Sequence, residues 1–67
     1  MDDAERVRRV GRLLYGERWL APLTATLAIN PRTLRRWASG QQAVPAAIVE
    51  RLRALMRERI RKLQQMI

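Results

Sequence analysis

Glycine and proline divide this 67-residue chain into four segments, and the apolar residues of each segment recur at helical spacing. Glycine commonly ends a helix, and proline is tolerated in a helix only within the first turn. Apolar residues three and four positions apart form one buried stripe, and no segment shows the strict alternation of a strand. The dividing positions are Gly16, Pro22, Pro31, Gly40 and Pro45. This pattern predicts an all-α, compact four-helix domain over residues 1–67.

The first helix is expected at residues 3–15. Asp2 is suited to cap its start and Gly16 to end it. Gly11, in the middle of this helix, would permit a close crossing by another helix, because glycine has no side chain. The buried stripe of the helix is expected to consist of Val7, Val10 and Leu14.

A long C-terminal helix is expected at about residues 45–65, with Pro45 as its first residue and a length of roughly 30 Å. Its second half carries apolar residues beyond what the core of a small domain requires. These are Ile60, Leu63, Met66 and Ile67. We expect them to form a symmetric homodimer contact, the alternatives being that this segment frays or docks on the first helix. Arg59 interrupts the heptad-like spacing, so no long coiled coil is expected.

The charge of the chain is strongly positive. Fourteen Lys and Arg residues stand against six Asp and Glu residues, for a net charge of +8, and all but one of the basic residues are arginine. The planar guanidinium group suits phosphates and guanine edges, so the composition favours a nucleic-acid partner. The alternative is a basic surface that only aids solubility.

The residue types present exclude several other classes of function. The chain has no Cys and no His, which removes disulfides and the usual zinc sites. Ser39 is its single serine, and it has neither a paired-carboxylate motif nor a glycine-rich phosphate loop. We therefore expect no enzymatic activity, no cofactor and no metal. No apolar run approaches a membrane span, and the first residues lack an apolar signal core, so a cytoplasmic location is expected.

The most informative stretch is residues 20–39. Two short helices are expected there, at about residues 21–28 and 31–39, with a tight turn between them. Asn30 is a favourable N-cap and Pro31 a favourable first helical residue. At about 100° per residue, Leu34 and Trp37 share the buried side of the second helix. The opposite side then presents Arg32, Arg35, Arg36 and Ser39, with Thr33 on the flank.

This stretch resembles the helix-turn-helix of phage repressor and Cro-like (Xre-type) proteins. The residues that carry the resemblance are Leu23, Thr24, Ala28, Ile29, Asn30, Leu34 and Trp37, followed by Ser39-Gly40 and Val44-Pro45. The sequence departs from the family pattern in having Thr24 in place of a small alanine and Ala28 in place of the turn glycine. The resemblance implies a central helix-turn-helix that inserts its second helix into the DNA major groove.

The resemblance also assigns roles to residues of the second helix. Arg32 and Arg36 would contact base edges, each preferring guanine, and Pro31 would make an apolar contact there. Contacts with phosphates would come from Thr33, Arg35, Ser39, Gln41 and Gln42. The implied protein is a sequence-specific transcriptional repressor or autoregulator of a prokaryote or phage. It would bind double-stranded DNA as a homodimer, on a palindromic operator with half-sites about 34 Å apart.

Two other readings remain open at the level of sequence. One is an antitoxin-type or other protein-interaction module, whose partner would be a small protein encoded by a neighbouring gene. The other is a membrane-surface binder, because the segment Arg51–Lys62 is basic and amphipathic. RNA binding is disfavoured, since the common RNA-binding modules use sheets, glycine loops or aromatic platforms.

Overall fold

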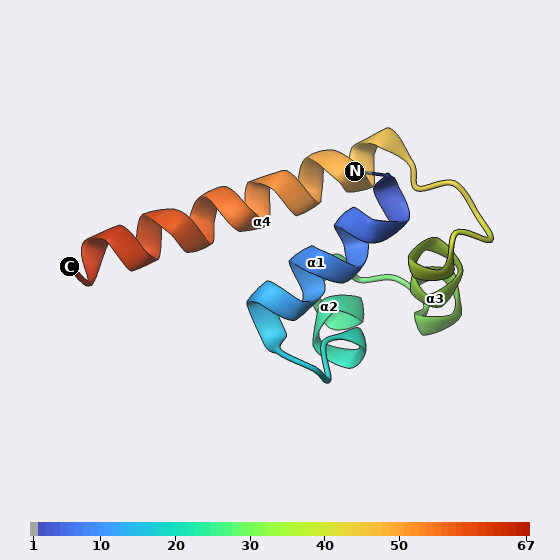
Figure 1. Cartoon of the computed structure of the whole chain (residues 1–67), viewed down its shortest axis with the longest axis horizontal. Helices are drawn as coiled ribbons and strands as arrows, with labels where there is room; N and C mark the ends of the chain where they lie inside the picture. Colours follow the sequence, from blue (N-terminus) through green and yellow to red (C-terminus); the bar gives the residue numbers. More distant parts are fainter. Residues whose placement is uncertain (1) are drawn as a thin grey trace.

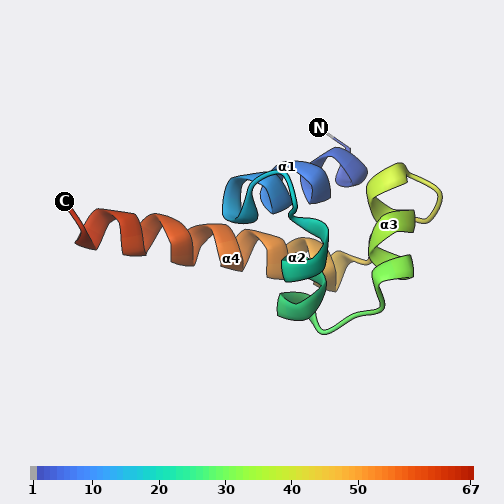
Figure 2. The same cartoon turned by 90° about the horizontal axis from the view of Figure 1, so that it is seen from below.

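The computed structural model describes residues 2–67, and its four helices confirm the all-α class. They are α1 (Asp3–Tyr15), α2 (Leu20–Leu27), α3 (Pro31–Ser39) and α4 (Ala46–Gln65). The first three helices lie around the beginning of α4 (Figure 1). The outer part of α4, residues 57–65, extends away from them, and all its side chains are exposed. A view turned by 90° shows the same separation, with α3 at one end of the molecule and the outer part of α4 at the other (Figure 2).

The predicted helix starts are confirmed where a side chain caps the backbone. Asp2 Oδ1 accepts a hydrogen bond from the backbone N–H of Glu5 at 2.7 Å, at the start of α1. Asn30 Oδ1 accepts one from the N–H of Arg32 at 2.8 Å, with Pro31 as the first residue of α3. Each cap satisfies a backbone donor that the helix itself leaves unpaired.

Three predicted boundaries are shifted by one residue, the first being the start of the second helix, which lies at Leu20 instead of residue 21. The second helix ends at Leu27 because Ala28 adopts the left-handed conformation, with φ 55° and ψ 48°. The fourth helix begins at Ala46, and Pro45 precedes it in an extended conformation with φ −60° and ψ 146°. The carbonyl of Pro45 accepts the N–H of Val49 at 3.1 Å, so the proline caps the helix instead of entering it.

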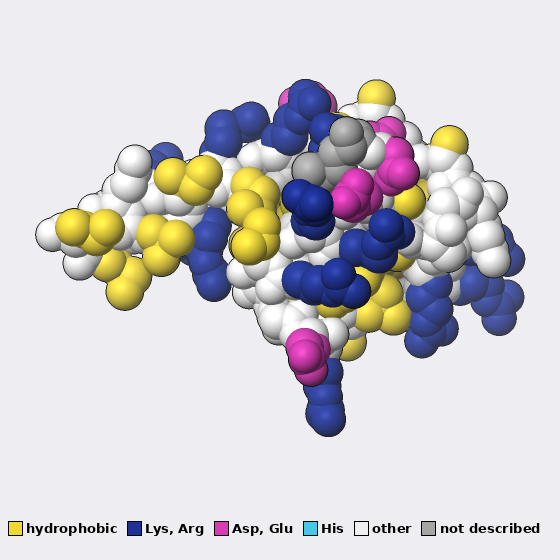
Figure 3. All heavy atoms as spheres, in the orientation of Figure 1, with side chains coloured by type: hydrophobic (Ala, Val, Ile, Leu, Met, Phe, Trp, Pro, Cys, Tyr) yellow, Lys and Arg dark blue, Asp and Glu magenta, His cyan; other side chains and the backbone are white. Residues whose placement is uncertain are grey.

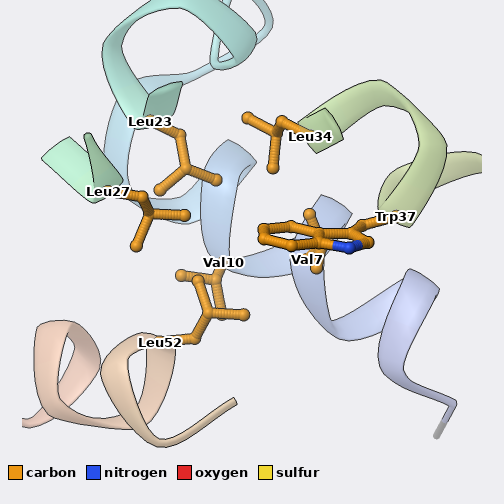
Figure 4. Close-up of a cluster of buried hydrophobic side chains, with 7 residues drawn as sticks. All are labelled: Val7, Val10, Leu23, Leu27, Leu34, Trp37 and Leu52. Atoms are coloured by element: carbon orange, nitrogen blue, oxygen red, sulfur yellow. The ribbon is translucent and has the colours of Figure 1, made fainter. Parts of the chain in front are cut away.

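One fully buried side chain from each helix meets at the centre of the domain. These residues are Val7, Leu23, Leu34 and Leu52. Val10, Leu27 and Trp37 complete the cluster (Figure 4). Burial of each such side chain is worth about 1.5–3 kcal/mol, so this cluster is the main source of stability. The predicted stripes of the first and third helices are confirmed by this packing, with Leu14 half-buried against its edge.

A close approach at Gly11 is present, but it is not a crossing of two helices. The indole of Trp19, just before α2, occupies the space beside Gly11. Trp19 is half-buried and packs against the core. The sequence prediction was therefore right about the position and wrong about the group that fills it.

Two arginines bind the C-terminal ends of helices in the motif. Arg51 of α4 donates to the carbonyls of Leu27 at 2.9 Å and Thr26 at 3.0 Å, at the end of α2. Arg8 of α1 donates to the carbonyl of Ala38, near the end of α3. The last carbonyls of a helix lack internal partners and carry its negative pole, so a cation is favoured there. Two of the positive charges of the chain therefore stabilise the packing of α1 with α3 and of α4 with α2.

Candidate nucleic-acid interface

The third helix divides cleanly into a buried and an exposed side. Leu34 has no exposed surface and Trp37 is 4% exposed, whereas Arg32, Arg35 and Arg36 are all exposed. This arrangement places the arginines where helical periodicity predicted them, on the side away from the core. Figure 3 shows basic side chains projecting over this end of the molecule.

The arginines of α3 form no ion pair within residues 2–67, and the carboxylate of Glu17 lines the same groove as Arg35. The ion pairs of residues 2–67 join Arg6–Asp3, Arg9–Glu5, Arg53–Glu50 and Lys62–Glu58, all within α1 or within α4. The sequence from Arg18 to Val49 contains no Asp or Glu at all. A positive surface of this kind attracts polyanions over several ångströms, and the attraction weakens as salt is added.

Polar groups surround the C-terminal end of α3. The side chain of Ser39 is exposed, and its hydroxyl donates to the carbonyl of Arg36 at 3.2 Å. The backbone N–H groups of Gln41 and Gln42 donate to the same carbonyl at 3.0 and 3.3 Å, which fixes the following turn against the helix. Both glutamine side chains are exposed, whereas Thr33 is half-buried.

A groove of about 550 Å³ separates α3 from the segment that leads into α2. Glu17 and Arg18 line it on one side, and Arg35 and Ser39 line it on the other. Sequence analysis did not single out Arg18. The only sequence signal was its place two residues before the start of α2, because a basic residue there can lie beside α3. The structure therefore adds Arg18 to the residues of this surface.

The apolar residues predicted as a dimer contact lie far from this surface. Ile60 and Leu63 are about half exposed, and Met66 and Ile67 are almost fully exposed. All four belong to the outer part of α4 or directly follow it. The long axis of the molecule measures 40 Å, with α3 at one end and these residues at the other (Figures 1 and 2).

Two other kinds of site are absent from residues 2–67. The described residues hold no group of acidic side chains that could bind a metal ion. Within residues 2–67, no helix combines the length and the apolar character needed to cross a membrane.

No protein-family model, characterised protein or solved structure matches this chain. The interpretation of the α3 surface therefore depends on its own geometry and charge.

Proposed function

We propose that this protein is a sequence-specific reader of double-stranded DNA and that α3 enters the major groove. The observation that carries the proposal is the exposed arginine face of α3, which lies opposite the buried Leu34 and Trp37 and forms no ion pair within residues 2–67. A helix fits the major groove of B-form DNA, where each base pair presents a distinct pattern of donors and acceptors. This reading agrees with the resemblance to Xre-type helix-turn-helix proteins.

Arg32 and Arg36 are assigned to base edges in this proposal. They are four residues apart, so their side chains lie on one side of α3, in its first turn and one turn later. Each guanidinium can donate two hydrogen bonds to O6 and N7 of a guanine, a contact worth about 1–3 kcal/mol of discrimination. Pro31 lies beside them at the exposed start of the helix and is assigned an apolar contact.

Residues beside the base-reading side are assigned to the DNA backbone. Arg35 and Arg18 line opposite sides of the groove next to α3, so both can meet a phosphate that runs past it. The polar groups around them are Thr33, Ser39, Gln41 and Gln42. Such contacts fix the position of the helix in the groove but carry no sequence information.

The proposed protein binds as a homodimer through the outer part of α4. The contact consists of Ile60, Leu63, Met66 and Ile67, all exposed, and no charged side chain follows Lys62. Because this contact lies at the opposite end of a 40 Å axis from α3, it holds the two reading helices far apart. Half-sites two helical turns apart, about 68 Å, fit this arrangement better than the single turn expected from sequence.

The biological role we propose is transcriptional repression or autoregulation. A protein bound in the major groove of a promoter blocks polymerase by occupying its site. A reporter gene placed behind the selected DNA site should therefore be expressed less when the protein is present, and normally when Arg36→Ala replaces it.

The experiment that tests the proposal is selection of binding sites from random duplex DNA at a stated, near-physiological salt concentration. The expected result is an inverted repeat with guanines at fixed positions. Arg32→Ala and Arg36→Ala should each lose the preference for guanine at one position. Arg61→Ala, which removes the same charge from the outer part of α4, should leave the preference unchanged. Failure to enrich any sequence, or an unchanged preference in both α3 variants, would overturn the assignment.

A further inference from the structure

A second surface feature lies between α1 and α4, and no residue of α3 lines it. This α1/α4 groove has a volume of about 420 Å³. Its floor is apolar and consists of Val10, Leu13, Leu52 and Met56. Its rim is basic and consists of Arg6, Arg9, Arg53 and Arg57. The proposed DNA contacts use none of these residues, so the groove requires a separate explanation.

One residue of the apolar floor, Leu13, is more exposed than the fold requires, whereas Val10 and Leu52 are buried and Met56 is half-buried. Leu13 is 66% exposed, although the next residue, Leu14, packs against the core. On α4 the apolar line continues outward from Met56 to Ile60 and Leu63, at spacings of four and three residues. Figure 3 shows hydrophobic side chains along the outer part of α4 on the same face as basic side chains of the adjoining surface. A continuous exposed apolar strip of this kind marks a binding surface.

The rim charge is available to a partner. Arg6, Arg9 and Arg53 pair with acidic residues one helical turn away on their own helices, and these pairs are exposed. Exposed pairs contribute little and exchange partners readily. Arg57 has no ion-pair partner among residues 2–67. No carboxylate lines the groove itself, but Asp3, Glu5 and Glu50 lie beside three of the rim arginines, so the uncompensated positive charge of the rim is that of Arg57.

We infer that the α1/α4 groove binds an amphipathic helix of another protein, whose apolar side is flanked by Asp and Glu. The exposed Leu13 and the half-buried Met56 form a short apolar strip between the arginines of α1 and those of α4, which suits the apolar side of a helix. The arginine rim selects acidic flanks, because charges of opposite sign across an interface favour the right partner and like charges exclude the wrong one.

A second copy of this chain fits the groove poorly. The segment that it could insert is the outer part of α4, whose apolar residues are accompanied by Arg57, Arg59, Arg61 and Lys62. These cations would face the arginine rim. The nearby Glu58 already pairs with Lys62 at 3.5 Å. DNA would match the rim charge but would leave the apolar floor exposed to water.

The test uses the full chain and three synthetic peptides labelled with a fluorophore. The first peptide is an amphipathic helix with leucines at i, i+3, i+4 and i+7 and glutamates on both flanks. The second has the same leucines with lysine flanks, and the third has the composition of the first in scrambled order. Fluorescence anisotropy should show binding of the first peptide only. Equal binding of the scrambled peptide would show that charge alone causes the binding, and it would overturn the inference. Equal binding of the lysine-flanked peptide would show that the arginine rim does not select acidic flanks, and it would also overturn the inference.

Substitutions then locate the binding site. Leu13→Glu should weaken binding of the glutamate-flanked peptide by about tenfold or more, since an apolar anchor becomes a repelling charge. Arg57→Glu should weaken it several-fold. Neither position is buried in the core, and thermal unfolding checks that both variants fold. The matched controls Arg32→Ala and Arg36→Ala should bind the peptide normally. Undiminished binding by Leu13→Glu would overturn the inference.

Two further measurements separate this inference from the proposed function. The peptide should bind equally well when the protein is saturated with its selected DNA, and displacement of the peptide by DNA would place it on α3 instead. Light scattering of Leu13→Glu should show the same oligomeric state as the parent chain. Loss of a dimer in this variant would assign the groove to a second copy and reject the acidic partner.

Discussion

The indole of Trp19 lies so close to Gly11 that a Cβ atom at residue 11 would be 2.6 Å from Trp19 Cδ2. Gly11 is buried in the middle of α1, where glycine costs about 0.5–1 kcal/mol relative to alanine. That cost is offset by the packing of a large aromatic ring against the bare backbone. The contact fixes the connection between α1 and α2, and thereby the position of α2 on the core.

Gly11→Ala is therefore expected to lower the free energy of unfolding, despite the higher helix propensity of alanine. The expected loss is about 1–2 kcal/mol, because the indole must move and overpacking outweighs the propensity gain. Urea denaturation at a fixed protein concentration measures it. In a Trp19→Ala background the same substitution should be neutral or stabilising. A stabilising effect in the parent chain would contradict the contact.

Ala28→Gly is expected to act in the opposite direction. Ala28 has φ 55°, a conformation that costs an L-residue with a side chain about 1 kcal/mol and glycine almost nothing. The substitution should raise the free energy of unfolding by about 0.5–1 kcal/mol in urea denaturation. Ala25→Gly, an exposed position within the same helix, serves as the matched control and should lower it by about 1 kcal/mol. Destabilisation by both would argue against the left-handed turn.

Arg51→Met should destabilise the fold without a matching effect on the surface proposed to read DNA. The variant keeps most of the aliphatic length and loses both hydrogen bonds to the end of α2, at a cost of about 1 kcal/mol. Arg53→Met is the control, since the guanidinium of Arg53 makes only an exposed ion pair with Glu50. Thermal unfolding should separate the two variants clearly, and equal melting temperatures would show that the Arg51 contact contributes nothing.

Arg35→Ala should change how DNA affinity depends on salt rather than which sequence is preferred. Removal of one phosphate contact lowers the slope of log K against log salt concentration by about 1. Titrations of the selected site at several salt concentrations measure the slope. Arg61→Ala removes an equal charge far from α3 and should leave the slope unchanged. A lost base preference in Arg35→Ala would assign this residue to a base edge.

Truncation after Glu58 should abolish the proposed dimer while preserving the fold. Every side chain from residue 57 onward is exposed, so its loss removes little core packing. Light scattering should report a monomer, and the free energy of unfolding extrapolated to the monomer should change by less than about 0.5 kcal/mol. In the full chain, Leu63→Glu should have the same effect on the oligomeric state. A dimer that survives both changes would place the contact elsewhere.

Local sequence signals predicted most of the fold. Asn30 and Pro31 define the start of α3 through a cap and a fixed φ angle, which depend only on neighbouring residues. Local sequence also predicts that Leu34 and Trp37 lie on the opposite side of α3 from the arginines, because helical periodicity determines which side each residue occupies. The residues that face outward on α3 were therefore predictable, although their roles on DNA stay predictions.

Contacts between distant residues were not predictable. Arg51 and the carbonyl of Leu27 are 24 residues apart, and nothing near Arg51 in the sequence distinguishes it from the other arginines of α4. The α1/α4 groove likewise depends on how Leu13 and Met56 meet across two helices. The left-handed conformation of Ala28 was suggested only by its place in the family pattern, where glycine is usual.

The position of the α1/α4 groove relative to α3 has a consequence for any two molecules that bind at these two surfaces. Because both surfaces belong to one domain with a long axis of 40 Å, a partner held in the groove stays within a few nanometres of whatever α3 contacts. Tethering over such distances corresponds to effective concentrations of roughly millimolar. A weak acidic partner would thus be concentrated at the DNA site itself, and it could act there at a free concentration too low to occupy the same site unaided.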